Sequence, residues 1–371
     1  MTKPIRILHV FGSLNRGGAE SRTMDIYRAI DRNKVQFDFV VHEDKQGFFE
    51  PEIKKLGGYI YHSMPRFRII NIFKCKRKWT HLLSSSKHEY ACIHIHTTNM
   101  ALPALIAAKK MGIKCRICHA RNASESGFIR RLIAFFLQKP LRNLSTHRFA
   151  VSDLAGRFTF SEDYEVKKNA INAGQFMYDD NKRNSIRQKL SINNEFVIGN
   201  IARFHEQKNH MFLIDVFAEV LKQIPHARLL LVGEGDLRQG IERKISLIGL
   251  SNKVVLLGER SDIPDLLQAF DLFLMPSLYE GLPGASTEAQ AAGLSCFLSV
   301  AITPEAQIIK DLVTYIPINK GIKPWVDEII KFAKNPPKRK SSTGEMKSSG
   351  YDIEEVAKWY ENFYLKLIYP L

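Results

Sequence analysis

The feature that most constrains this chain is a strand-then-helix order that repeats along both of its halves. Short apolar runs end at polar or glycine-rich loops, and apolar residues at helical spacing follow these loops. The expected strands cover residues 5–11, 37–42, 92–96, 115–120 and 146–152 in the first half, and 196–204, 227–233, 253–258 and 271–277 in the second. Such alternation is typical of parallel sheets with crossover helices. The chain is therefore predicted to form two doubly wound α/β units.

The length of 371 residues is sufficient for two domains with separate cores. We expect a first domain at 1–175 and a second at 176–351, with a cleft between them. An aromatic amphipathic helix at 352–371 is expected to pack back on the first domain. The segment 335–350 is rich in polar residues, Pro, Ser and Gly, and is predicted to be mobile.

Composition excludes several classes of protein. Hydrophobic residues make up 45% and charged residues 25%, which is ordinary for a soluble globular protein. No apolar run approaches 18 uncharged residues, so no transmembrane helix is predicted, and the apolar run near the N-terminus is interpreted as a first strand, not a signal peptide. The pair Cys115 and Cys118 has no second pair to complete a metal site, and buried free thiols are expected.

The net charge of +16 lies entirely in the first half. Residues 1–175 hold 30 Lys and Arg against 14 Asp and Glu, whereas residues 176–371 hold 24 of each. This asymmetry predicts that the first half faces an anionic partner, which could be a phospholipid surface, a nucleic acid or an acidic substrate.

Two segments of the basic half combine cations with apolar and aromatic residues. These are PRFRIINIFKCKRKW at 65–79 and SGFIRRLIAFFLQKPLRN at 126–143. Both fit basic amphipathic elements at an anionic membrane surface. The alternative is that they are core-facing helices with solvated basic residues.

Three loops after expected strands carry residues suited to phosphate binding. FGSLNRGGAES (11–21) places Gly17 and Gly18 before a helix, although it is neither a G-x-G-x-x-G sequence nor a P-loop. ARFHEQKNH (202–210) places Arg203 and Lys208 at a helix entrance, where two cations would grip a diphosphate or simply be solvated. VGEGDLR (232–238), which contains Gly233, is compatible with a plain turn.

A fourth loop, in LYEGLPGASTEAQAAGLS (278–295), sets Glu280 before a helix and Glu288 inside it. A carboxylate accepts two hydroxyl donors side by side, as sugars offer them. The backbone from Leu282 to Ala285 remains available for phosphate. Alternatively, the two acids only complement the helix N-terminus.

In this order and at these spacings, the four motifs resemble the retaining GT-B glycosyltransferases of family 4. E-G-L-P-G-A-S-T-E is similar to the E-x7-E motif of that family, and N-I-A-R-F-H-E-Q-K-N-H to its G-R-x-x-x-x-K-N region. L-L-L-V-G-E-G-D-L-R is similar to its V-G-x-G strand end, and R-G-G-A-E-S to its first loop. The resemblance extends from about residue 5 to 335 and is closest to bacterial exopolysaccharide, capsule and teichuronic-acid enzymes. It implies the GT-B fold, with two Rossmann-like domains facing a central cleft.

The resemblance also implies roles for individual residues. Glu280 would bind donor-sugar hydroxyls and Glu288 the ribose, while Arg203 and Lys208 would bind the diphosphate and stabilise the leaving group. His119 would lie near the transferred sugar; its alternative is a buried histidine at a strand end. The remaining expected donor-binding residues are Gly17, Gly18, Gly233, Glu259, Leu282, Gly284 and Ala285.

The expected activity is metal-independent, retaining transfer of a sugar from a nucleotide diphosphate sugar, UDP-sugar above all, to a lipid-linked or glycan acceptor in cell-surface polysaccharide synthesis. No cofactor, metal or nucleic-acid partner is expected, because the chain has no D-x-D sequence and no known nucleic-acid-binding signature. The expected location is the cytoplasm, at the inner face of the membrane. A nucleotide-sugar epimerase of the same fold and a basic nucleic-acid-binding protein are the alternatives.

Overall fold

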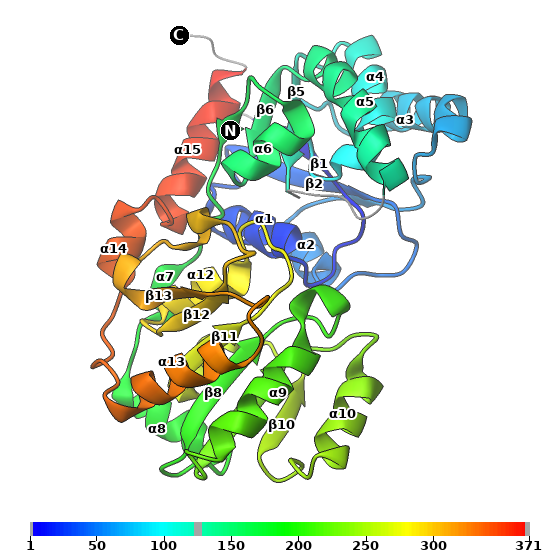
Figure 1. The fold of residues 1–371 in the computed structure, drawn as a ribbon. Coiled ribbons are helices and arrows are strands. Elements are labelled where there is room, and N and C mark those ends of the chain that lie inside the picture. Colours follow the sequence, from blue (N-terminus) through cyan, green and yellow to red (C-terminus); the bar gives the residue numbers. More distant parts are fainter. Residues whose placement is uncertain (1–2, 122–127, 368–371) are drawn as a thin grey trace. The chain divides into compact units, whose positions relative to one another are not determined.

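The protein forms two compact α/β units, each with its own parallel sheet (Figure 1). The structure is a computed structural model, and it describes residues 3–121 and 128–367. Unit 1 contains residues 1–171 and 350–371, and unit 2 contains residues 172–349. The division therefore falls between Ile171 and Asn172, close to the expected boundary at 175/176.

Unit 1 is built on a seven-stranded sheet of order β3-β2-β1-β4-β5-β6-β7, in which every neighbouring pair is parallel. Its strands are β1 (Ile5–Phe11), β2 (Val35–Val41), β3 (Ile60–Tyr61), β4 (Cys92–Ile95), β5 (Cys115–Ala120), β6 (His147–Ala150) and β7 (Glu165–Val166). Its helices are α1 (Gly18–Ala29), α2 (Glu50–Lys55), α3 (Ile72–Ser85), α4 (Ala101–Lys110), α5 (Phe128–Leu144), α6 (Asp153–Phe160) and α15 (Ile353–Lys366).

Strand alternation divides the core of unit 1 into two layers. On one face, Ile7 and Phe37 pack with Tyr364 of α15, and on the other Leu8 and Ile93 pack with residues of α4. The C-terminal helix α15 lies against α1 and β2. Glu361 fixes it there by accepting hydrogen bonds from the Asp31 backbone N–H at 3.1 Å and from Lys34 at 3.0 Å.

Unit 2 has a six-stranded sheet of order β10-β9-β8-β11-β12-β13, again parallel throughout. Its strands are β8 (Phe196–Ile201), β9 (Ala227–Val232), β10 (Val254–Gly258), β11 (Leu272–Met275), β12 (Cys296–Ser299) and β13 (Val313–Ile316). Its helices are α7 (Ala173–Phe176), α8 (Asp180–Lys189), α9 (His210–Leu221), α10 (Arg238–Leu247), α11 (Ile263–Ala269), α12 (Gly284–Ala291), α13 (Lys323–Lys334) and α14 (Thr343–Ser348).

The chain order reverses between β8 and β11, which lie side by side in the sheet of unit 2. Ligands of open α/β sheets bind beyond the carboxyl ends of the strands at such a switch point. A ligand site in this unit is therefore expected at the loops that leave β8 and β11.

The prediction of a mobile segment at 335–350 is wrong. The segment includes the helix α14, and Arg339 is tied to unit 2 by hydrogen bonds to backbone carbonyls. Its Nε donates to Ala292 O at 2.7 Å and its Nη2 to Leu267 O at 3.0 Å. A buried guanidinium overrides the loop-like composition of its neighbours.

Candidate functional site

The site in unit 2 is centred on a contact between two loops at the switch point. Residues 202–209 leave β8, and residues 276–283 leave β11. Lys208 of the first loop donates a hydrogen bond from Nζ to Oε1 of Glu280 on the second. The side chain of Lys208 is 20% exposed and that of Glu280 is 10% exposed. The sequence-predicted cation and acid thus form one ion pair at the position where an α/β sheet binds ligands.

Backbone and amide hydrogen bonds hold the two loops together on either side of this ion pair. The N–H of Leu278 donates to Gln207 O at 2.8 Å, and Gln207 Nε2 donates to Tyr279 O at 2.8 Å. Asn209 Nδ2 donates to Pro276 O at 3.2 Å. Neither Gln207 nor Asn209 was singled out from the sequence, because their partners lie about seventy positions away along the chain.

Asn209 also sets the direction of the helix that follows Lys208. Its backbone is left-handed, with φ 58° and ψ 42°, a conformation that Asn tolerates better than most residues. This turn ends the 3₁₀ turn Glu206–Lys208 and begins α9 at His210. The local sequence K-N-H therefore fixes where Lys208 leaves the backbone.

Arg203 lies in the same β8 loop but remains exposed. Its side chain is 68% exposed, and its Nη2 is 3.7 Å from Oδ2 of Asp236. An ion pair of this kind contributes little to stability, so the guanidinium is available to another partner. Arg203 and Lys208 thus share a loop while differing in environment.

Gly233, at the end of β9, is required by its surroundings. Its φ is +140°, and a Cβ there would collide with the carbonyl oxygen of Ala202. Only glycine allows the β9 loop to approach the β8 loop so closely. The first glycine of the V-G-x-G sequence therefore has a structural role in this chain, because it allows the β9 loop to pack against the segment that carries Arg203.

The remaining predicted residues of unit 2 lie around the start of α12 and the end of β10. Gly284 begins α12 and Ala285 follows it; both are partly exposed, as is Leu282 in the loop before them. Glu288 is half-buried within α12, and Glu259 is exposed directly after β10. A Cβ added at Gly284 would meet nothing within 4 Å in the described part of the chain, so the helix start is open.

Several buried polar atoms around these loops have no hydrogen-bond partner among the described residues. They include Oδ1 of Asn200, Oγ of Ser277 and both ring nitrogens of His210. Burial, and to a lesser extent the charge of Lys208, lowers the pKa of His210 to about 4, so its imidazole is neutral at pH 7. Such orphaned groups are compatible with ordered water behind the site. Nothing in the sequence signalled them.

The predicted residues of unit 1 differ in accessibility. Gly17 caps the start of α1, and Gly18 is exposed at its first position. His119, at the carboxyl end of β5, is 1% exposed. Its Nδ1 is 3.0 Å from Nε2 of His94, and its Nε2 has no hydrogen-bond partner among the described residues. Burial holds the pKa of His119 well below its usual range, so it is a neutral hydrogen-bonding group.

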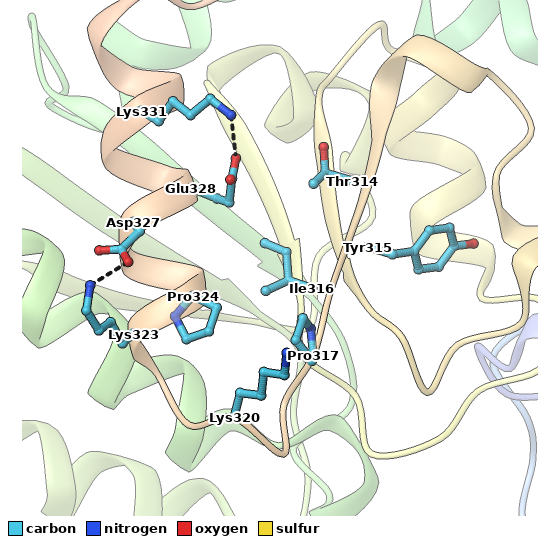
Figure 2. Close-up of a pocket in the computed structure, with 10 residues that line it drawn as sticks. All are labelled: Thr314, Tyr315, Ile316, Pro317, Lys320, Lys323, Pro324, Asp327, Glu328 and Lys331. Carbon is cyan, nitrogen blue, oxygen red and sulfur yellow. Dashed lines mark hydrogen bonds and ion pairs between the residues drawn. The ribbon is translucent and has the colours of Figure 1, made fainter.

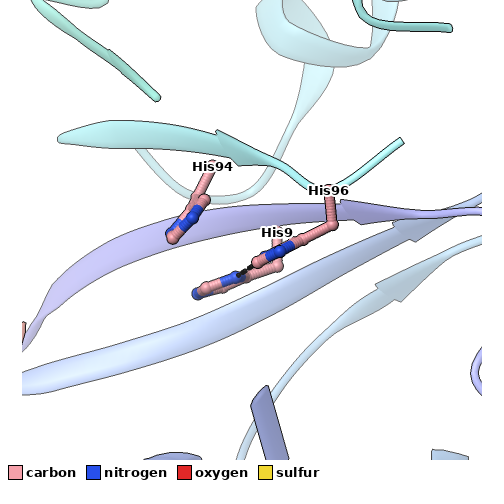
Figure 3. Close-up of side chains that lie close together, drawn as sticks. All are labelled: His9, His94 and His96. Carbon is pink, nitrogen blue, oxygen red and sulfur yellow. Dashed lines mark hydrogen bonds between the residues drawn. The ribbon is translucent and has the colours of Figure 1, made fainter. Parts of the chain in front are cut away.

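His119 belongs to a buried imidazole cluster that the sequence analysis did not identify. Its other members are His9 on β1, His94 on β4 and His96 just after β4 (Figure 3). His9 and His94 are register partners, and Nδ1 of His9 is 3.0 Å from Nε2 of His96. The alternating sequence C-I-H-I-H was the available signal that His94 and His96 share a face.

Three of these histidines could also ligate a metal ion. One nitrogen from each of His9, His94 and His96 lies within 4.8 Å of the others. Their pKa values are lowered, mainly by burial, which supplies the neutral imidazoles that metals bind. However, the guanidinium of Arg121 contacts His96 Nδ1 at 3.0 Å. A divalent cation beside this buried positive charge would be disfavoured.

A hollow of about 810 Å³ lies elsewhere in unit 2, between β13 and α13 (Figure 2). Lys320, Lys323 and Lys331 line it, and two of these cations are paired with acids of α13, as the dashed lines show. None of the predicted site residues lines this hollow. The sequence motifs and this concavity therefore identify different places.

Comparison with known proteins decides between the alternatives. The family model for "Glycosyl transferases group 1" matches residues 182–347. The chain is 33% identical over 362 residues to EpsF of Bacillus subtilis (strain 168), which is named as a glycosyltransferase, and the match covers 94% of each chain. The chain belongs to the group 1 glycosyltransferase family. These matches confirm the family and the enzyme class that were predicted from the sequence motifs.

Two further relatives and one solved structure extend the comparison. The chain is 28% identical to the capsular polysaccharide biosynthesis glycosyltransferase CapH of Staphylococcus aureus, over 77% of this chain and 78% of CapH. It is 26% identical to an Escherichia coli UDP-Gal:α-D-GlcNAc-diphosphoundecaprenol α-1,3-galactosyltransferase, over 57% and 58%. The crystal structure of Anabaena Alr3699/HepE with UDP and glucose aligns with a TM-score of 0.79 at 19% identity, over 97% of this chain and 99% of that one. The predicted GT-B fold, with two Rossmann-like units, is confirmed.

Proposed function

We propose that this glycosyltransferase moves a sugar from a UDP-sugar to a lipid-linked or glycan acceptor in the synthesis of a cell-surface polysaccharide. The observation that carries the proposal is the Lys208–Glu280 pair at the switch point of unit 2, with Arg203 in the same loop. The named activities of CapH and of the E. coli galactosyltransferase support the polysaccharide and the acceptor. The HepE complex supports a UDP-sugar as donor.

In this proposal the ion pair holds the donor site ready before the donor arrives. Lys208 donates a hydrogen bond to Glu280, so each charge has a partner within the protein. The donor would divide the pair, because phosphate oxygens attract the ammonium and sugar hydroxyls donate to the carboxylate. Arg203 would add a second cation to the diphosphate, and Glu288 would accept hydroxyls of the ribose.

Charge stabilisation of the departing diphosphate would then come from protein cations. Arg203 and Lys208 would favour the charge that develops on the leaving group, and the open backbone at the start of α12 would add N–H donors. The absence of a D-x-D sequence agrees with a site that needs no divalent metal. We propose transfer with retention at the anomeric carbon, and NMR of the isolated product tests it: an inverted linkage would exclude the retaining assignment.

The donor site itself can be tested by thermal unfolding with a panel of UDP-, GDP- and ADP-sugars. We expect one UDP-sugar to raise the unfolding temperature of the parent protein, and Glu280→Ala and Arg203→Ala to lose that shift. Lys222→Ala is the matched control, because Lys222 also pairs with a glutamate, Glu219, but both of these side chains are exposed. A shift of equal size in all variants would remove Glu280 and Arg203 from the site, and release of an epimerised sugar without acceptor would favour the epimerase.

We further propose that a surface of unit 1 binds an anionic membrane. Five apolar side chains on or beside α3 and α5 are largely exposed, and both helices pack against α4 (Figure 1). These side chains are Ile70 (90% exposed), Phe73 (83%), Leu132 (45%), Phe135 (64%) and Phe136 (67%). Exposed cations, among them Lys74 and Lys78, lie on the same α3 helix. No helix in the described part of the chain is long and apolar enough to span a bilayer.

Basic residues beside exposed aromatics favour a lipid surface over water, with each cation near an anionic surface contributing about 1 kcal/mol. Unit 1 carries 32 Lys and Arg against 18 Asp and Glu, which strengthens the attraction. Flotation with phosphatidylglycerol vesicles tests the proposal. Binding should fall in the Phe135→Ser, Phe136→Ser double variant and persist in Leu247→Ser, which alters a 79% exposed leucine of unit 2. Binding that ignores both salt and the double variant would exclude this surface.

A further inference from the structure

A charged side chain of unit 1 remains without a counter-charge in the site described so far. Arg121 directly follows β5, two positions after His119, and is only partly exposed. No carboxylate among the described residues lies within ion-pair distance of its guanidinium. Burial lowers its pKa to about 10, and Glu20 is the acid whose charge reaches it without direct contact. A cation held in this way is costly unless an anion joins it.

The contacts that Arg121 does make orient its side chain without neutralising it. Nε and Nη2 lie 3.2 and 3.0 Å from Nδ1 of His96, and Nη1 donates to Oδ1 of Asn169 at 2.6 Å. The lone pair of one imidazole nitrogen accepts one hydrogen, and an arginine offers five N–H donors. Donors therefore remain for a further partner.

A second partly buried arginine, Arg339 of unit 2, illustrates a guanidinium with a structural role. All three nitrogens of Arg339 donate to backbone carbonyls, at 2.7 Å to Ala292, 3.0 Å to Leu267, and 3.3 Å to Gln268 and Phe270. Arg339 thereby completes a loop. Arg121, by contrast, meets one imidazole and one amide, and these contacts leave part of its fork unused.

The histidine cluster fixes the orientation of this fork. Because an arginine only donates, His96 must accept at Nδ1, so neutral His96 carries its hydrogen on Nε2 and donates it to His9 Nδ1. His9 then carries its own hydrogen on Nε2, which has no partner among the described residues. A cavity of about 10 Å³ lies beside His9, Thr23 and Arg121. Arg121 therefore donates to a chain of neutral imidazoles, in which His96 donates in turn to His9.

The chemistry of this arrangement selects an anion with several oxygens. An arginine fork matches two oxygens of one phosphate, and Arg121 lies at the carboxyl end of a parallel strand, where α/β sheets bind ligands. The same positive charge disfavours a metal ion on His96. The predominance of basic residues in unit 1 draws anions to this unit.

We propose that Arg121, seated on His96 and Asn169, is a phosphate-binding group of unit 1 and that the diphosphate of a lipid-linked acceptor is its ligand. The inference rests on the proposed function for the identity of the acceptor, but not for the binding of phosphate. Arg121 positions the acceptor and takes no part in breaking the bond to the donor sugar.

Titration calorimetry with farnesyl diphosphate, without any donor, tests the binding. Arg121→Gln should weaken binding at least tenfold and Arg121→Lys partly restore it, whereas Arg203→Ala should leave it within twofold. UDP should show the converse pattern. Inorganic pyrophosphate and phosphatidylglycerol vesicles, tested beside farnesyl diphosphate, distinguish the possible sources of the bound phosphate. Equal weakening of the binding of all three ligands in Arg121→Gln would support a general phosphate site at Arg121. Weakened binding of the vesicles alone would overturn the assignment to the acceptor.

Two controls keep the result interpretable. Arg157→Gln removes an exposed arginine of unit 1 and should leave farnesyl diphosphate binding unchanged. Glu125→Gln tests for a counter-charge from the neighbouring sequence outside the described residues. The proposal is overturned if Arg121→Gln stays folded and binds farnesyl diphosphate like the parent, or if Glu125→Gln and Arg121→Gln destabilise the ligand-free protein equally. In turnover, a raised acceptor KM with an unchanged donor KM supports it, and failure of donor binding alone would count against the proposed function instead.

Discussion

Lys208 and Glu280 are in direct contact although 72 positions separate them in the sequence. Each lies in a loop that leaves one of the two neighbouring strands, β8 and β11, at which the sheet of unit 2 reverses its order. The pair is therefore a consequence of topology: no local property of either segment brings the ammonium to the carboxylate. Both side chains are largely enclosed, and each is the counter-charge of the other.

The first prediction separates the structural from the functional part of this pair. Glu280→Gln and Lys208→Met should each lower the free energy of unfolding by about 2 kcal/mol, because each leaves one enclosed charge unpaired. The double variant should recover at least about 1 kcal/mol of the summed loss. Activity should be lost in all three variants. Urea unfolding and transfer assays measure the two effects, and recovery of activity in the double variant would reduce the pair to a structural role.

Gln207 should act as a positioning residue. Its Nε2 donates to Tyr279 O next to Glu280, while its backbone carbonyl accepts from Leu278. Gln207→Ala should lower kcat/KM about tenfold by loosening Glu280, with stability changed by less than about 0.5 kcal/mol. Gln207→Glu keeps the shape of the side chain but cannot donate a hydrogen bond to Tyr279 O, so it should behave like Gln207→Ala. Steady-state kinetics decide the matter, with exposed Gln223→Ala as the control; a fully active Gln207→Glu enzyme would contradict the positioning role.

Gly233 provides a test of why the V-G-x-G sequence occurs here. Gly233→Ala should cost about 3 kcal/mol, because the substituted residue is strained at φ +140° and its Cβ collides with Ala202 O. Gly249→Ala should cost only about 1 kcal/mol, since its φ is +71° and no atom of the described residues lies within 4 Å of an added Cβ. Denaturant unfolding compares the two variants. Equal losses would show that strain, and not the close approach of the loops, governs Gly233.

Much of this fold was predictable because apolar strand runs and helical spacing are local properties. The strands from β1 to β11 that bear the motifs were expected within a few residues, as was the helix α12 that follows Glu280 and contains Glu288. Contacts across the sheet were not. The spacing of His94 and His96 indicates that they share a face of their strand. Their contact with His9, however, depends on β1 lying beside β4, and this strand order could not be predicted from the sequence.

The error at residues 335–350 has a related cause. Polar composition predicted mobility, whereas Arg339 finds four carbonyls of other segments that only the folded unit brings together. Similarly, the importance of Gln207 and Asn209 could not be read from the motif, since both act through amide groups on carbonyls of the second loop. The composition of a segment reflects the local preferences of its residues and does not reveal partners that lie far away along the chain.

The last prediction concerns acid stability and His210. Burial lowers the pKa of His210 to about 4 in the folded protein, below the value of about 6.5 in the unfolded chain. As the pH falls from 6.5 to 4, the unfolded state takes up a proton that the folded state refuses, so this residue destabilises the fold progressively over that window. Between pH 7 and pH 5 the penalty amounts to about 2 kcal/mol. His210→Leu should therefore lose about 2 kcal/mol less than the parent over this step.

Urea unfolding at pH 7 and pH 5 measures the difference directly, and comparison within each protein cancels any change in packing that the leucine introduces. His226→Leu is the matched control, because His226 is exposed in the same unit. The contributions of the buried imidazoles of unit 1 remain in every variant and do not affect the comparison. If His210→Leu and the parent lose the same stability between the two pH values, His210 is not held neutral by its burial, and a water or ligand must meet its two ring nitrogens.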